Sequence, residues 1–183
     1  MCHGKVGTIS KSILKALTRV NCEEIILGIE SGNNAILRGL NKKQKVNDIL
    51  RTVKLIKESG INIGATFIIG SPHENVKTFL QTLKLLFKIN PTYAVFNILT
   101  PLPGTILFEY MKKENLIVTY DWSKFDAMSG YPVIRSFYLD PHNFRSFQRI
   151  AYFLWYLYKL VTYVIIQKIR DLLNNFIDIF LTI

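Results

Sequence analysis

Three short apolar segments alternate with segments of helical spacing, and this alternation constrains the fold more than any other feature. The apolar segments, each expected to be a strand, are residues 24–29, 61–69 and 93–99. The segments with apolar residues three or four positions apart, each expected to be a helix, are residues 10–20, 46–59, 74–89 and 106–114. Strands that alternate with helices form parallel sheets with the crossover helices outside. The sequence therefore predicts an α/β fold, a partial parallel (βα) barrel of about three βα units.

The chain is expected to divide into three parts. Residues 1–125 form the (βα) core, residues 126–143 an irregular connector, and residues 144–183 an apolar and basic helical tail. The first expected element is a helix, and a parallel sheet of three strands leaves two open edges, which proteins rarely leave bare. We therefore expect the rest of the sheet to come from sequence upstream or from another chain.

Composition narrows the possible functions only slightly. Hydrophobic residues make up 49% of the chain, which suits a packed core and argues against disorder. The formal net charge of +10 attracts anions, nucleic acid or acidic lipid. Nucleic-acid binding rests on this charge alone, because no helix-turn-helix or zinc finger is recognisable. The first residues contain no apolar run of the kind found in secretory signals.

The chain has two cysteines, Cys2 and Cys22. Two thiols cannot build a disulfide framework, and they cannot supply the three or four thiolates of an iron–sulfur cluster. No metal-binding residues are therefore predicted. Cys22 is expected to be a reduced, small apolar residue, and the role of Cys2 stays open. This usage fits a reducing cytoplasm.

The loop after the first expected strand carries Glu30 and Ser31. The carboxyl ends of parallel barrel strands form the active face, so we expect both side chains to point at the barrel mouth. There Glu30 would accept hydrogen bonds from hydroxyls or an amine, and Ser31 would donate one to a carboxylate. In the alternative interpretation, Ser31 or Asn33 caps a helix and Glu30 lies on the surface.

The loops after the second and third strands also carry candidate residues. Gly70 allows close approach of a ligand to the backbone, and Glu74 is expected to open the next helix, where its charge suits the helix dipole. His73 is expected to be a solvated loop residue. The third loop, residues 99–105, is stiffened by two prolines and could present backbone amides to a flat ring. Taken singly, either loop could equally be a plain turn.

The three loops together resemble the radical S-adenosylmethionine superfamily, most closely the branch that often carries an N-terminal cobalamin-binding domain. The matching pieces are "GIESGNNAILRGLNKK", "GINIGATFIIGSPHEN" and "PTYAVFNILTPLPGTILFEYMKKENLI", within residues 5–125. The resemblance implies that this chain holds strands four to six of a six-unit barrel. It also implies an S-adenosylmethionine site: Glu30 and Ser31 at the ribose and methionine, Ile68 and Gly70 at the adenine, and Leu99, Thr100 and Pro101 closing over the ring.

One departure from the family decides what the chain can do alone. The C-x3-C-x2-C motif that holds the family's [4Fe-4S] cluster is absent. Thr66 and Asn75, in the matching piece "GINIGATFIIGSPHEN", depart from the family pattern in a minor way. The resemblance thus implies an enzyme part that is active only with an N-terminal half supplying the cluster, with cobalamin in the full-length family. No catalytic residue is assigned, and whether this chain alone is an enzyme stays open. The alternative is a non-catalytic remnant or a basic, membrane-associated binding module.

The tail from residue 144 is apolar and predicted to be helical. Residues 150–167 contain one charge, Lys159, and five aromatic residues crowd the first half of this stretch. Residues 169–183 have an amphipathic pattern. The tail could pack on the barrel or another domain, lie on a membrane surface helped by its positive charge, or span a membrane. A peripheral membrane location is accordingly the alternative to a purely cytoplasmic one.

Overall fold

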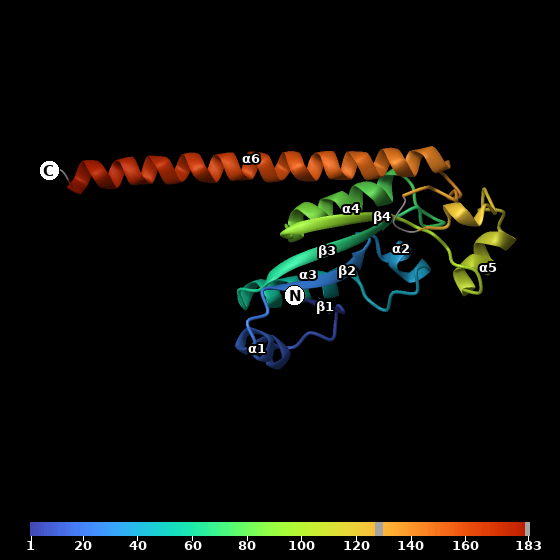
Figure 1. Ribbon diagram of the computed structural model, residues 1–183, viewed down its shortest axis with the longest axis horizontal. Helices are drawn as coiled ribbons and strands as arrows, with labels where there is room; N and C mark the ends of the chain where they lie inside the picture. The colour runs from blue at the N-terminus through green and yellow to red at the C-terminus, as the bar shows by residue number, and fades with distance from the viewer. Residues whose placement is uncertain (127–129, 182–183) are drawn as a thin grey trace. The chain divides into compact units, whose positions relative to one another are not determined.

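A computed structural model shows four parallel strands in a single sheet, in the order β1-β2-β3-β4 (Figure 1). It describes the backbone of residues 1–126 and 130–181 and the side chains of residues 1–126 and 130–169. The strands are β1 (Cys2–Gly4), β2 (Glu24–Glu30), β3 (Asn62–Ile69) and β4 (Tyr93–Ile98). The parallel α/β fold predicted from the sequence is confirmed.

Helices connect the strands, and capping residues set where several of them start. The helices are α1 (Lys11–Arg19), α2 (Asn34–Gly39), α3 (Val46–Glu58), α4 (Val76–Ile89), α5 (Ile106–Lys113), the 3₁₀ helix η1 (Trp122–Lys124) and α6 (Pro141–Leu181). The Ser10 hydroxyl accepts a hydrogen bond from the backbone N–H of Ile13, which confirms the predicted cap of α1. Asn75, and not Glu74, caps α4, so the expectation that Glu74 opens this helix was wrong.

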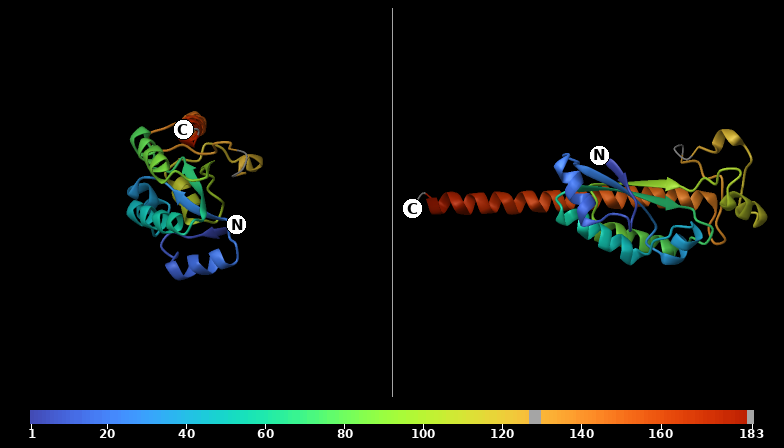
Figure 2. Two further views of the ribbon diagram at one scale, coloured as in Figure 1. Left: turned by 90° about the vertical axis from the view of Figure 1, so that its left-hand side faces the viewer. Right: turned by 90° about the horizontal axis from the view of Figure 1, so that it is seen from below.

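Helices α3 and α4 lie on one side of the sheet (Figure 2). The side chains that alternate toward these helices are buried, among them Leu27, Ala65 and Phe96. Side chains of the opposite parity, such as Thr66 and Ile68, are half-buried. We call this second side the open face of the sheet. Residues 61–69 were expected to be covered on both faces, but among the described residues Thr66 and Ile68 are only half-buried, so this chain alone does not fully cover the second face.

Strand β1 is a correction to the sequence analysis, which placed a helix first and counted three strands. It pairs in parallel with β2, with Cys2 opposite Ile25 and Gly4 opposite Leu27. Three residues are too few to show the alternation that identifies a strand, so pairing with β2 is what defines it.

At the opposite edge of the sheet, formed by β4, the side-chain amide of Gln148 donates a hydrogen bond to the backbone carbonyl of Phe96, 2.6 Å away.

The chain forms two compact units, Met1–Arg149 and Ile150–Ile183. The first contains the sheet and the segment expected to be an irregular connector, residues 126–143. Ile134 of this segment forms an isolated antiparallel bridge with Ile117, which precedes it in the core. The second contains the rest of helix α6, so the predicted helical tail is confirmed as a helix up to Leu181. The amphipathic pattern expected for residues 169–183 falls on side chains that lie, from residue 170, outside the described residues.

Candidate functional site

The register of the sheet brings the three predicted loops to one end. Glu30 pairs with Phe67 across β2 and β3, and Ile68 pairs with Asn97 across β3 and β4. The backbone N–H of Leu99 then donates to the carbonyl of Ile69 at 2.8 Å. The carboxyl ends of β2, β3 and β4 are thus adjacent, as the common direction of their arrows shows (Figure 1).

Glu30 lies at this end in an unusual backbone conformation. Its φ angle is +64°, beside an irregularity in the β2–β3 register. The side chain folds back over Gly28, and Oε1 lies 2.6 Å from Nζ of Lys42. With 6% of its surface exposed, Glu30 is not the surface residue of the alternative interpretation. It is a nearly buried carboxylate with one oxygen committed to an ion pair.

The loop after α2 shapes the surroundings of Glu30. Besides Lys42, it contributes Gln44, whose side-chain amide donates to the carbonyls of Gly28 and Ile29 at 3.0 and 3.2 Å. A cavity of about 530 Å³ adjoins this loop. It is lined by Gly4, Lys5, Val6, Gly28, Leu40, Asn41, Lys42, Lys43 and Gln44. Three lysines and no acid line this cavity, so it favours an anionic group.

Ser31 does not extend toward the same space. Its side chain is fully buried, and its hydroxyl lies 3.2 Å from the hydroxyl of Thr82 on α4. The same oxygen accepts from the backbone N–H of Asn33 at 3.1 Å. Asn33 itself caps α2, as the alternative interpretation expected. The Ser31 hydroxyl is therefore engaged by the helical layer and not directed at the mouth of the sheet.

The second loop contains a buried carboxyl group that the sequence analysis placed at a helix start. Glu74 is 1% exposed, and its Oε2 accepts the backbone N–H of Gly70. Burial raises the pKa of Glu74 to about 7, against the opposing effect of hydrogen bonds from the backbone of Gly70 and Ser71. The Ser136 hydroxyl donates to the Glu74 backbone carbonyl at 2.9 Å. Glu74 thus ties the loop to the segment that precedes α6.

Gly70 has a φ angle of +99°, which favours glycine. A Cβ there would meet ring carbons of Phe144 at 3.3 Å and Cδ1 of Ile134 at 3.4 Å. On the side where a Cβ would project, the side chains of Phe144 and Ile134, and not a ligand, make the close approach to the Gly70 backbone. His73 is exposed as expected, and its ring stacks on Phe137 with centroids 5.0 Å apart.

The remaining predicted residues follow β4. Leu99 is 8% exposed and Pro101 is buried, whereas Thr100 is half-buried and its hydroxyl lies 3.4 Å from the carbonyl of Ile98. Ile68 is half-buried on the open face beside Asn97. The structure therefore brings Glu30, Ile68 and Leu99 to one rim, while their contact with a ligand stays a prediction.

Two residues around the site were missed by sequence reasoning. Lys42 and Gln44 reach Glu30 and Gly28 from a loop twelve or more residues away, and nothing in their local pattern indicates this. Glu74 was singled out but given the wrong role. Its spacing indicates the observed one, because a carboxylate four residues after a left-handed glycine can return to that glycine's N–H.

The described residues do not fit an iron–sulfur cluster. They contain no group of three His, Cys, Asp or Glu side chains placed to hold a metal ion. The two thiols lie 3.8 Å apart, with Cys2 starting β1 and Cys22 preceding β2. They are therefore at the amino ends of the strands, opposite the rim that carries Glu30. Burial and the neighbouring Cys22 raise the pKa of the Cys2 thiol, which favours its protonated form.

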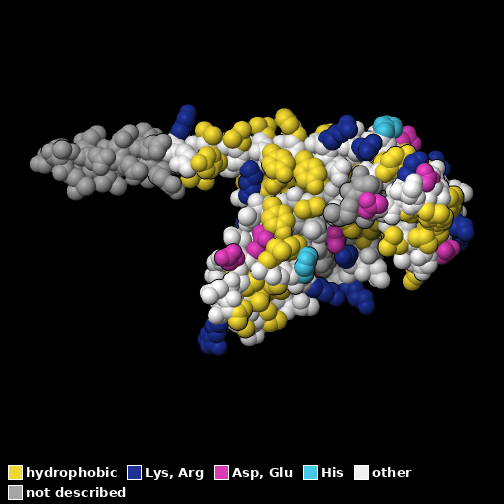
Figure 3. Space-filling model, in the orientation of Figure 1, with side chains coloured by type: hydrophobic (Ala, Val, Ile, Leu, Met, Phe, Trp, Pro, Cys, Tyr) yellow, Lys and Arg dark blue, Asp and Glu magenta, His cyan; other side chains and the backbone are white. Residues whose placement is uncertain are grey.

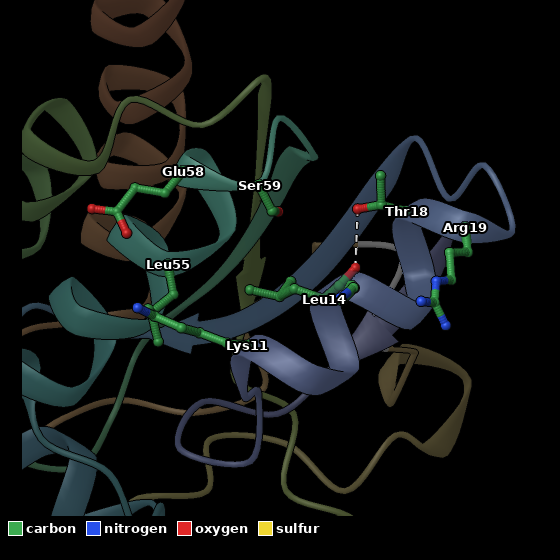
Figure 4. Close-up of a pocket in the computed structure, with 8 residues that line it drawn as sticks. Lys11, Leu14, Thr18, Arg19, Leu55, Glu58 and Ser59 are labelled. Atoms are coloured by element: carbon green, nitrogen blue, oxygen red, sulfur yellow. Dashed lines mark hydrogen bonds between the residues drawn. The ribbon is translucent and has the colours of Figure 1, made fainter.

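A separate groove of about 520 Å³ lies between α1 and α3 (Figure 4). Leu14 and Leu55 form its apolar part, and its charges come from Lys11, Lys15, Arg19 and Glu58. The hydrogen bond drawn there, from the Thr18 hydroxyl to the Leu14 carbonyl at 3.0 Å, is internal to α1. The groove is on the helical layer and does not belong to the rim.

Residues 5–86 match the Radical SAM superfamily. This segment belongs to that superfamily. An uncharacterized methyltransferase of Pyrococcus horikoshii is 32% identical over 153 residues, covering 84% of this chain and 33% of the relative. A bacteriochlorophyllide d C-12(1)-methyltransferase of Chlorobaculum tepidum is 33% identical, with 60% and 24% coverage. The chain thus spans about a third or less of the length of these two curated relatives.

Solved structures share the fold of the segment. The radical S-adenosylmethionine methyltransferase TsrM of Kitasatospora setae, solved with cobalamin and a [4Fe-4S] cluster bound, superposes with a TM-score of 0.57 at 18% identity. The match covers 61% of this chain and 22% of TsrM. Elp3 of Methanocaldococcus infernus gives 0.57 at 20% identity, covering 62% of this chain and 28% of Elp3. These similarities confirm the radical SAM type of partial barrel.

Proposed function

We propose that this chain supplies the S-adenosylmethionine-binding rim of a radical SAM enzyme of the methyltransferase class. The observation that carries the proposal is the convergence of Glu30, Ile68 and Leu99 at the carboxyl ends of adjacent strands in a superfamily segment. The cysteines for a [4Fe-4S] cluster would come from polypeptide outside this sequence, and cobalamin, where used, would bind there too. When bound, the cluster would supply the electron that cleaves S-adenosylmethionine.

The roles of this chain's residues are binding and shielding. Glu30 offers the carboxylate oxygen not held by Lys42 to the ribose hydroxyls, a charge-assisted hydrogen bond. Lys5 and Lys43, which make no ion pair among the described residues, line the adjoining cavity and would attract the methionine carboxylate. Ile68 offers a half-buried apolar surface for the adenine ring.

The open face of the sheet supports the need for a partner. Thr66 and Ile68 stay half-buried, and β1 presents an edge of three residues. Unpaired strand edges and bare apolar faces are usually covered. An N-terminal radical SAM half, or a cobalamin-binding domain on another chain, would cover both. Methyl transfer is favoured over other radical chemistry because two relatives named above are methyltransferases.

The first test is calorimetric titration of the full chain with S-adenosylhomocysteine, which cannot be cleaved to a radical. We expect saturable binding that Glu30→Ala weakens at least about tenfold, as expected for loss of a charge-assisted hydrogen bond. Glu23→Ala, an exposed carboxylate before β2, is the matched control and should bind like wild type. Absence of saturable binding, or equal loss in both variants, would contradict the assignment of the rim.

The second test concerns the cluster. Anaerobic reconstitution with iron and sulfide should give cluster absorbance only when a polypeptide with the three-cysteine motif is present. Cluster formation by this chain alone would show that the account of the missing ligands is wrong.

A further inference from the structure

Helix α6 exposes a long series of large apolar side chains. Over Pro141–Ile169 its length and composition would allow it to cross a membrane. Each of the following is at least 42% exposed: Ile150, Phe153, Tyr156, Leu157, Leu160, Val161, Tyr163, Val164, Ile165, Ile166 and Ile169. Figure 3 shows hydrophobic side chains along the described part of α6 on the face in view. An apolar surface of this extent marks an interaction site.

Part of this surface forms one stripe. Phe153, Tyr156, Leu157, Leu160 and Val164 stand at positions i, i+3, i+4, i+7 and i+11, so they share one side of the helix. Phe153, Tyr156 and Leu160 are 61–66% exposed, the highest fractions in the stripe. The stripe combines aromatic rings with aliphatic side chains, as helices that lie at the boundary of headgroups and acyl chains do.

The charges of the helix indicate which kind of surface would cover the stripe. Residues 141–169 contain Arg145, Arg149, Lys159 and Lys168 but no Asp or Glu. Lys159 Nζ lies 4.5 Å from the centre of the Trp155 ring, close to the middle of the helix. A bilayer centre disfavours such a charge, which argues against a span. Pairing of two copies along α6 would bring like charges together.

We propose that the Phe153–Val164 stripe of α6 lies in the surface of an anionic lipid bilayer. Its aromatic and aliphatic side chains enter the boundary region, while the lysines and arginines contact acidic headgroups. Each cation near an anionic surface contributes about fivefold to affinity, and burial of one large apolar side chain contributes about tenfold or more. This inference concerns α6 alone and does not depend on the proposed enzymatic function.

Flotation of the full chain with vesicles tests the proposal. Vesicles of phosphatidylglycerol and phosphatidylcholine should bind the chain at low salt, and binding should weaken at high salt and on pure phosphatidylcholine. We expect Phe153→Asp to weaken binding about tenfold or more, and Lys168→Gln, which removes an exposed cation of α6, to weaken it about fivefold. Val20→Asp, which changes an exposed apolar residue at the end of α1, is the matched control and should leave binding unchanged.

Three outcomes would overturn the proposal. The first is absence of binding at low salt. The second is equal binding to both vesicles together with resistance to alkaline carbonate extraction, which would indicate a span. The third is a dimer that Phe153→Asp dissociates in the absence of any lipid binding, which would make α6 an interface between copies.

Discussion

Glu74 gives the most direct test of how the rim is built, because its carboxyl group is buried and partly satisfied by backbone N–H groups. Burial raises its pKa from the ordinary value of 4.5 to about 7. A group that binds its proton more tightly in the folded state favours folding at low pH and loses that contribution as the pH rises. Glu74 should therefore lower the free energy of unfolding by about 3 kcal/mol as the pH rises from about 5 to about 8, with no further change above.

The change Glu74→Gln removes this titration while keeping the size of the side chain. The amide oxygen of the variant can still accept the backbone N–H of Gly70. Relative to wild type, it should gain about 3 kcal/mol between about pH 5 and about pH 8, because only the wild type then ionises a buried group. Urea unfolding, followed by circular dichroism across this range, measures the difference.

Glu58→Gln is the control, because Glu58 is exposed on α3 and should leave the pH dependence as in the wild type. The carboxyl carbon of Glu74 can also be followed by ¹³C NMR, and its titration should centre near 7. Parallel stability profiles of wild type and Glu74→Gln, or a titration midpoint below about 5, would refute the reasoning.

Two further predictions concern the contact between the first loop and α4. We expect Gly32→Ala to lower the free energy of unfolding by about 3 kcal/mol, because the added Cβ would overlap the backbone of Gln81 and lie 2.7 Å from Cα of Thr82. The control is Gly39→Ala, whose added Cβ would have no atom within 4 Å, so this variant should be neutral or slightly stabilising. Urea unfolding midpoints of the two variants measure the difference. We expect Thr82→Val to lower the free energy of unfolding by about 1–3 kcal/mol, because the backbone N–H of Gly32 loses the hydroxyl that accepts its hydrogen bond at 2.9 Å. Hydrogen exchange measures this loss, and the amide of Gly32 should exchange faster in the variant.

Local sequence patterns predicted those parts of the fold that short-range interactions determine. Ser10 caps α1 as predicted, and residues 61–69 form a strand within one residue of its expected start. Strand β1 was missed because its three residues become a strand only by pairing with β2, which lies some twenty residues away. A strand of this kind has no periodicity from which to infer it.

The sequence predicted that the three loops meet at one edge of the sheet, but not how their side chains are oriented. The three loops converge as parallel strands require, yet Ser31 turns to Thr82, and Phe144 packs against Gly70. Both differences come from tertiary packing onto α4 and α6, which the loop sequences do not encode. The ion pair of Glu30 with Lys42 has the same origin, because it depends on where the loop after α2 returns.

The backbone of Glu30 allows its stability role to be separated from its proposed binding role. A φ angle of +64° costs a non-glycine residue on the order of 1 kcal/mol, and the ion pair with half-exposed Lys42 returns less than about 1 kcal/mol after solvent screening. Glu30→Gly removes both terms, so its stability should stay within about 1 kcal/mol of wild type. Glu30→Ala removes only the ion pair and keeps the strain, so urea unfolding should find it about 1 kcal/mol less stable than Glu30→Gly.

Both variants should bind S-adenosylhomocysteine equally weakly, because both lack the carboxylate. Equal stability of the two would mean that residue 30 does not adopt the left-handed conformation, and wild-type binding by either would mean that Glu30 does not contact the ligand.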